Sequence, residues 1–161
     1  MCFNISIRNN KNIIENHLNA KFESDIIFKP RKHISAFTNP LIPVITSQDK
    51  TIIQHYYWGL IPEWTNNIIK ANELRKMTYN ARCETIEEKP SFKNSIANNK
   101  CLIIADGFYE WQSTSAGKIC HYITSPKYEL FTFAGIWSNW LDKTNGKQIK
   151  SVSIITQKAN K

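Results

Sequence analysis

Short runs of alternating or wholly apolar residues recur along most of the chain, and such runs are typical of β-strands. In residues 3–8, for example, Phe3, Ile5 and Ile7 share one side of an extended chain. The runs that we predict as strands are 3–8, 41–46, 51–58, 101–105, 119–124, 129–137 and 151–156. No internal repeat, low-complexity tract or linker interrupts them. The pattern predicts a single α+β domain that is rich in strands and has few short helices.

Helical patterns are confined to two short stretches. Asn12 can cap a helix whose apolar face carries Ile13, Ile14, Leu18 and Phe22. Ser91 can cap a second helix that runs through Ala97. Residues 66–78 are polar and basic, and we predict a mobile loop there.

The stretch 101–111 combines a buried strand with a candidate catalytic group. Its apolar first half is followed by Asp106-Gly107, which predicts a turn, and then by Glu110 among three aromatic residues. On a strand, Glu110 shares a face with Phe108, opposite Tyr109 and Trp111. A carboxylate that loses hydration there has a raised pKa and suits proton transfer near neutral pH. The alternative is a glutamate at the rim of a hairpin, paired with a Lys or Arg.

Two other stretches carry residues suited to nucleic acid. The segment 58–64 (WGLIPEW) breaks a strand and leaves two tryptophans close together. Aromatic rings on a rigid turn can stack on unpaired bases, and the alternative is a buried aromatic corner. In an extended segment 78–85, Asn80 and Arg82 fall on the same side. An amide beside a guanidinium suits an oxyanion or a phosphate, whereas the alternative is a turn Asn and a salt-bridged Arg.

Composition adds a charge argument. The 161 residues are 42% hydrophobic, enough for a folded core, and carry a formal net charge of +8 with a pI of about 9.4. This charge indicates an acidic partner, with nucleic acid first, and the alternative is a solvated basic surface. No run approaches transmembrane length and the N-terminus does not resemble a signal peptide. We expect a cytoplasmic protein that makes no membrane contact.

The cysteines and histidines show no metal-binding pattern. Cys2, Cys83, Cys101 and Cys120 lie far apart and form no CxxC pair, so zinc is not predicted. We interpret the last three as core or packing thiols. The four histidines have neither metal nor triad spacing, and none is assigned a role.

Several segments together resemble one family, the SOS response-associated peptidases, also known as abasic-site processing proteins. The matching pieces occur in the family's order and span nearly the whole chain. They are Cys2 directly after Met1, Trp58 to Trp64, Asn80 to Thr85, Ser91 to Lys93, Cys101 to Trp111, Phe133 to Trp137, and Ser153 to Thr156. The resemblance implies a mostly antiparallel sheet that is curved or barrel-like.

The resemblance also implies a function. Members of the family bind single-stranded DNA and form a covalent adduct with the aldehyde of an abasic site. The α-amine of a Cys2 exposed by removal of Met1 attacks the aldehyde, and its thiol closes a thiazolidine ring. An α-amine with a pKa of about 7.7–8.0 is partly neutral, hence nucleophilic, at physiological pH. The adduct needs no metal or organic cofactor, and we expect a monomer.

Residue roles carry over from the family by position. Cys2 becomes the nucleophile, Glu110 the acid/base group, and Asn80 the residue that holds the N-terminus or the sugar oxygen. Arg82 would bind a flanking phosphate. The residues that would shape the floor under the DNA strand are Trp58, Gly59, Pro62 and Trp64.

The chain departs from the family pattern in two places. Many members continue after the initial Cys with Gly-Arg, whose Arg touches phosphate, but here Phe3 and Asn4 follow. Other cations would then hold the DNA, and the candidates are Arg31, Arg75 and Lys76. The family's catalytic His lies just past the last matching strand, and the chain ends at Ala159-Asn160-Lys161. We expect one domain over residues 1–161 that lacks the family's C-terminal segment. Either the sequence is a fragment of a longer protein, or it is a shortened member of the family with impaired chemistry. The alternatives to the cross-linking function are a noncovalent single-stranded DNA-binding module and a thiol peptidase.

Overall fold

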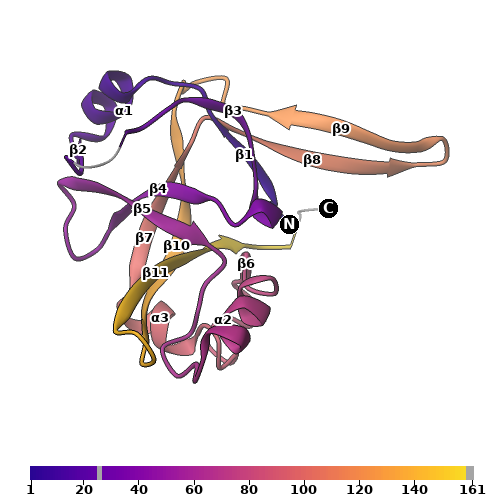
Figure 1. The fold of residues 1–161 in the computed structure, drawn as a ribbon. Coiled ribbons are helices and arrows are strands. Elements are labelled where there is room, and N and C mark those ends of the chain that lie inside the picture. Colours follow the sequence, from indigo (N-terminus) through magenta and orange to yellow (C-terminus); the bar gives the residue numbers. More distant parts are fainter. Residues whose placement is uncertain (25–26, 159–161) are drawn as a thin grey trace.

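The computed structural model describes residues 1–24 and 27–158, and its strands form two sheets (Figure 1). The smaller sheet is antiparallel, with four strands in the order β3-β1-β8-β9. Its strands are β1 (Asn4–Ile7), β3 (Arg31–Ser35), β8 (Gly107–Thr114) and β9 (Gly117–Ile123). The segment that begins the chain therefore lies between β3 and the strand that carries Glu110.

The larger sheet has seven strands in the order β2-β5-β4-β7-β10-β11-β6. They are β2 (Lys21–Phe22), β4 (Leu41–Thr46), β5 (Ile52–Trp58), β6 (Asn80–Arg82), β7 (Lys100–Ala105), β10 (Phe131–Asp142) and β11 (Lys147–Thr156). A parallel pairing of β11 with β5 closes five of them into a barrel. The strand-rich α+β fold with a barrel-like, mostly antiparallel sheet is confirmed.

In the described part of the chain, three α-helices lie outside the barrel: α1 (Lys11–Leu18), α2 (Ile68–Arg75) and α3 (Lys93–Asn98). The cap of α1 is Asn10, whose side chain accepts the Ile13 amide, and the helix ends before the predicted Phe22. The predicted loop at 66–78 is wrong, because Asn67 caps α2 through the Lys70 amide. Among the described residues, no helix has both the length and the apolar character needed to cross a membrane.

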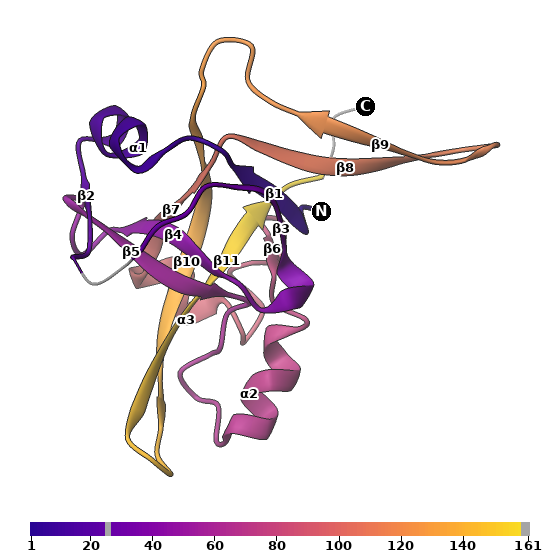
Figure 2. The same cartoon turned by 45° about the horizontal axis from the view of Figure 1, so that its top comes forward.

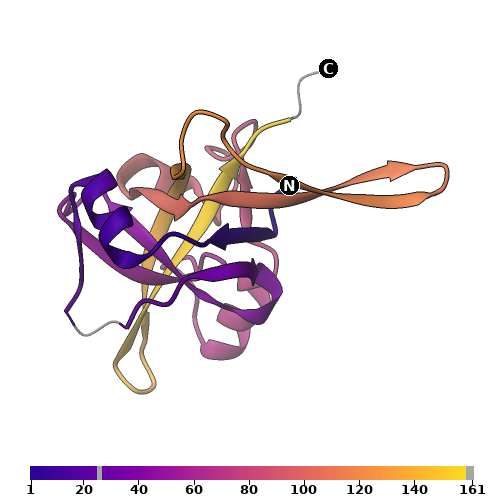
Figure 3. The same ribbon diagram turned by 90° about the horizontal axis from the view of Figure 1, so that it is seen from above.

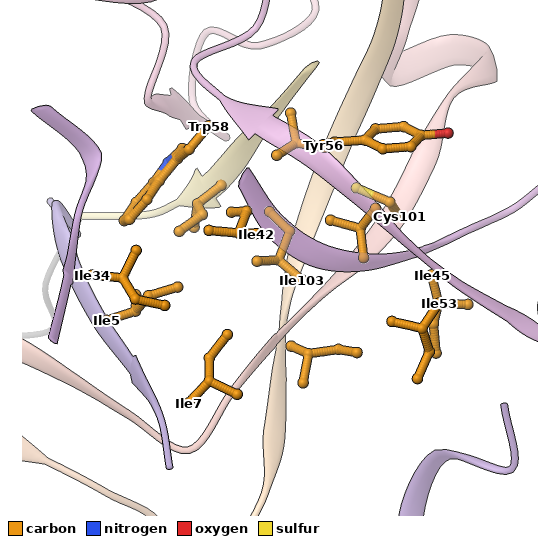
Figure 4. Close-up of a cluster of buried hydrophobic side chains, with 14 of the residues drawn as sticks. Ile5, Ile7, Ile34, Ile42, Ile45, Ile53, Tyr56, Trp58, Cys101 and Ile103 are labelled. Carbon is orange, nitrogen blue, oxygen red and sulfur yellow. The ribbon is translucent and has the colours of Figure 1, made fainter. Parts of the chain in front are cut away.

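The barrel interior forms the main hydrophobic core (Figure 4). Ile42, Ile103 and Trp58, from three barrel strands, are fully buried. Ile5 and Ile34, from the smaller sheet, face the same cluster. All four residues of β1 are buried, because the barrel covers one side of the strand and polar networks cover the other. The smaller sheet thus packs across the barrel and fixes the N-terminal segment over it.

The junction between β7 and β8 is a change of sheet and not a hairpin turn. β7 belongs to the barrel and β8 to the smaller sheet. The buried Asp106 carboxylate fixes this junction by accepting hydrogen bonds from Ser6 Oγ (2.6 Å) and from the amides of Arg8 and Asn9. The prediction that Gly107 adopts a positive φ in a turn is wrong. Glycine is needed because a Cβ would lie 2.3 Å from the Tyr122 hydroxyl.

The β8–β9 hairpin projects from the body of the molecule (Figures 1 and 3). Every residue of β9 is exposed, whereas β8 is partly buried at its base, where Glu110 lies. In the view from above, the N-terminus lies beside this hairpin (Figure 3). The base of the hairpin therefore forms one wall beside the N-terminus.

Gly59, at the end of β5, gives a prediction for stability. Its φ is +108°, and a Cβ there would lie 2.6 Å from the Arg75 carbonyl oxygen. Gly59→Ala is expected to lower the free energy of unfolding by about 2–4 kcal/mol, because backbone strain and overpacking each cost about 1–3 kcal/mol. Gly117→Ala is the matched control, since its φ is +127° but nothing lies within 4 Å. Urea unfolding measures both, and equal losses would contradict the steric argument.

Candidate functional site

Cys2 is held by Asn80, a residue that lies 78 positions away in the sequence. Asn80 Oδ1 accepts the Cys2 amide at 3.1 Å, and Asn80 Nδ2 donates to the Cys2 carbonyl at 2.9 Å. Asn80 begins β6, an edge strand that pairs with β11. This reciprocal pair fixes both backbone groups of Cys2, so the position of its nitrogen is set by the barrel.

The Cys2 side chain points into the protein and is only 5% exposed. Burial raises the pKa of its thiol to about 12. The thiol Sγ donates to the Asn4 carbonyl at 3.9 Å. The thiol therefore stays protonated near neutral pH. A cysteine protease needs a thiolate, so this environment does not support direct attack by Cys2 on external peptides.

Glu110 faces the start of the chain from the smaller sheet. Its Oε1 lies 3.2 Å from the α-ammonium of Met1, and its side chain remains 37% exposed. As the strand pattern predicted, Phe108 packs against Phe131 and Phe133, whereas Tyr109 on the other face packs against Tyr122. Glu110 thus contacts Met1, the residue directly before Cys2. Its carboxylate remains accessible to water, whereas the catalytic interpretation of the sequence expected it to lose hydration.

Arg82 also lies beside this N-terminus. Its Nη2 is 3.8 Å from the Met1 sulfur, and its side chain is exposed. Together with Met1, Glu84, Thr156 and Lys158 it lines a cleft of about 520 Å³. The predicted alternation holds, since both Asn80 and Arg82 reach the N-terminal segment. Arg82 is available to an anion that enters this cleft.

Sequence reasoning missed an aromatic cluster that supports the N-terminal segment. The ring of Phe3 stacks on Phe37 at 5.3 Å between centroids and meets Tyr79 edge-on at 6.3 Å. Phe37 is exposed, and Tyr79 is buried. Phe3 therefore orients the N-terminal segment by packing. The alternation of Phe3 with Ile5 and Ile7 indicated that the Phe3 ring would pack against the protein. It could not indicate the partners of the ring, because they come from distant segments.

The segment 58–64 divides between the core and the surface. Trp58 is 0% exposed and donates its indole N–H to the Tyr79 carbonyl at 3.0 Å. A fully buried ring offers no surface to a base, so its position corrects the predicted stacking role and fits the buried aromatic corner. Pro62 is also buried, whereas Trp64 is exposed and donates to the Pro90 carbonyl. Trp58 therefore supports the site through Tyr79, the residue that precedes Asn80.

The three cations that we predicted to hold DNA in place of the family's arginine do not lie together at the N-terminus. Arg31 pairs with Ile7, at the end of β1 away from Cys2, and its Nη2 donates to the Leu41 carbonyl. Arg75 is buried at the end of α2, and Lys76 follows it on the surface. None of the three lines the cleft beside Met1 and Arg82. Their contact with DNA stays a prediction.

The remaining cysteines differ from our expectation. Cys101 is buried, and burial raises the pKa of its thiol to about 12. Cys83 and Cys120 are exposed, so the prediction that both are packing thiols is wrong. Among the histidines, His33 bonds Asn4 Oδ1 through Nε2 at 2.8 Å, close to the N-terminal segment.

These features define a class of domain: a closed barrel and a second sheet that together hold the chain's own N-terminal segment, with an asparagine on Cys2 and a glutamate on the amine of Met1. The family model described as SOS response associated peptidase (SRAP) matches residues 1–161. The chain belongs to this family.

Relatives and solved structures agree with the assignment. The abasic site processing protein YoqW of Bacillus subtilis is 32% identical over 149 residues, which are 92% of this chain and 64% of that protein. The abasic site processing protein HMCES of Xenopus tropicalis is 32% identical over 122 residues, 65% of this chain and 36% of that protein. The chain thus spans less than two thirds of the length of these relatives.

A crystal structure of a protein from Bacteroides thetaiotaomicron superposes with a TM-score of 0.91 at 38% identity, over 99% of this chain and 69% of that one. A protein from Bordetella bronchiseptica superposes with a TM-score of 0.82 at 22% identity, over 98% and 73% of the two chains. The second likeness shows the fold alone.

Proposed function

We propose that this protein acts in the DNA-damage response by binding single-stranded DNA and forming a covalent cross-link with abasic sites through Cys2. The names of the relatives support the abasic site as the target. The observation that carries the proposal is the arrangement at the N-terminus. Asn80 fixes both backbone groups of Cys2, and Glu110 lies 3.2 Å from the amine one residue before it.

The proposed chemistry begins with removal of Met1, which makes the Cys2 nitrogen a free α-amine. We propose that the protein removes Met1 itself: one water hydrolyses the Met1–Cys2 peptide bond, which releases methionine and leaves the amine on Cys2. The neutral amine adds to C1 of the open-chain abasic sugar, and loss of one water gives an imine. The thiol sulfur then adds to the imine carbon while its proton passes to nitrogen, which closes a thiazolidine. The net change is aldehyde plus cysteine to thiazolidine plus water.

The electrostatics of the N-terminus support each role. Asn80 Oδ1 already accepts from the Cys2 nitrogen and can orient the free amine. The high pKa of the Cys2 thiol keeps its proton available for transfer to the nitrogen as sulfur adds. Glu110 can move protons at the sugar, and Arg82 can bind a flanking phosphate. The exposed ring of Phe37 offers a base a stacking surface nearby.

The test uses intact-mass spectrometry of the protein with Met1 confirmed absent. Incubation with a single-stranded abasic oligonucleotide is expected to add the mass of the oligonucleotide minus one water. An oligonucleotide with a tetrahydrofuran in place of the abasic sugar is the control, because it has no aldehyde and should add nothing. Binding of both oligonucleotides without any covalent product would favour the noncovalent binding module instead.

A further inference from the structure

A second pocket, remote from Cys2, lies where α2 meets β5 and the start of β11. Its volume is about 280 Å³, and its lining includes His55, Tyr57, Arg75, Lys147 and Lys150. Both α2 and the start of β11 lie at the end of the barrel away from the N-terminus (Figure 2). Among the described residues that line this pocket, none carries a carboxylate.

Arg75 is the feature that needs explanation. It is only 7% exposed, and its guanidinium lies 4.6 Å from the centroid of the Tyr57 ring. Its Nε and Nη2 atoms find no hydrogen-bond partner within the described part of the chain. Burial lowers the pKa of Arg75, yet a guanidinium remains charged in proteins. A buried, unpaired cation is strongly unfavourable unless an anion compensates it.

The neighbours of Arg75 add further hydrogen-bond donors to the pocket. Lys147 adds a second, exposed cation to the pocket lining, and Lys150 contributes to the same wall. The Nδ1 atom of His55 is also buried, and it finds no partner among the described residues. Burial lowers the pKa of His55 to about 4, so its ring is neutral at pH 7 and can donate one hydrogen bond. Each of these groups can donate to an anion, and the pocket supplies no acceptor carboxylate.

We propose that this pocket binds a phosphate group, with Arg75 as the central donor and Lys147 as the second charge. A guanidinium presents paired N–H groups that match two phosphate oxygens, and a dianion is compensated by two cations. The phosphate belongs either to a free phosphorylated compound or to the backbone of a nucleic acid. The proposal does not rest on the cross-linking function, because the pocket and the Cys2 site share no residue.

The first experiment measures binding of pyrophosphate by calorimetry and by thermal unfolding at constant ionic strength. At a concentration ten times its Kd, pyrophosphate is expected to raise the Tm by about 3 °C. Arg75→Met should weaken binding at least tenfold and remove the shift. Lys147→Met, at an exposed position that does not endanger folding, should weaken it several-fold. Lys118→Met removes the same charge on the remote β9 hairpin and should change nothing.

The outcomes separate the site from a general salt effect and identify the source of the phosphate. Equal pyrophosphate shifts in wild type, Arg75→Met and Lys147→Met would overturn the proposal, as would no shift in the wild type. If an undamaged oligonucleotide without terminal phosphates displaces pyrophosphate, the site binds a strand phosphate. If it does not, the site binds a free phosphate. Because neither assay contains an abasic site, failure here leaves the cross-linking proposal unaffected.

Discussion

Cys2→Ala is expected to abolish the stable cross-link to abasic single-stranded DNA while leaving noncovalent binding within about twofold of the wild type. After removal of Met1, Cys2 carries both an α-amine and a thiol, which can close a five-membered ring on the aldehyde carbon. Alanine keeps only the amine. An amine alone gives a labile imine that water reverses. The measurement is the yield of adduct that survives heat denaturation on a gel, with Met1 confirmed absent from both proteins.

The matched control is Cys83→Ala, which removes an exposed thiol at the end of β6 while leaving Cys2 in place. This variant should form the adduct at the wild-type rate. A stable adduct of undiminished yield in Cys2→Ala would eliminate the thiazolidine assignment. Loss of the adduct in both variants would point to a general effect of removing thiols.

Glu110→Gln is expected to slow adduct formation by at least tenfold. An abasic sugar is mostly a closed hemiacetal, so a proton must move before the aldehyde becomes available to the amine. A positioned general acid or base contributes roughly 10²–10⁴-fold. Glutamine keeps the shape and hydrogen-bonding reach of the side chain but cannot take up or release this proton. A time course on an abasic oligonucleotide measures the rate, and affinity for undamaged DNA should change little.

Two controls separate proton transfer from a structural effect of this substitution. Glu88→Gln makes the same change in charge at an exposed position outside the cleft and should keep the wild-type rate. An oligonucleotide that carries an acyclic aldehyde needs no ring opening, so Glu110→Gln should react with it nearly as fast as the wild type. Equal rates of wild type and Glu110→Gln on the abasic sugar would leave ring opening to the solvent.

Local patterns predicted most strands and few of the helix details. Residues 41–46 and 51–58 pair as β4 and β5 because their alternation and polar link are properties of the local chain. The helix α2 was missed because it is polar along much of its length, and Asn67, its cap, lies inside a polar stretch. The barrel closure between β5 and β11 joins segments about 95 positions apart, and no local signal predicts it.

The candidate site was predictable where it depended on strand alternation. Phe108 and Tyr109 lie on opposite faces of β8, and Asn80 and Arg82 both reach the N-terminus. The resemblance to a family supplied the pairing of Cys2 with Glu110, which no spacing shows. The sequence left the burial of Trp58 open as one of two alternatives, because its partner Tyr79 comes from a separate segment. The burial of Arg75 against Tyr57 could not be predicted, because no local pattern places α2 on β5.

The ion pair between the Met1 ammonium and Glu110 has a consequence for the timing of the proposed reaction. While Met1 is present, the Cys2 nitrogen is an amide without nucleophilic character, and the carboxylate proposed for proton transfer is neutralised by a cation. One cleavage removes both restraints, since it creates the amine and releases Glu110 together. The newly made chain would therefore be inactive in the manner of a zymogen. It could not react with cellular aldehydes until Met1 is removed.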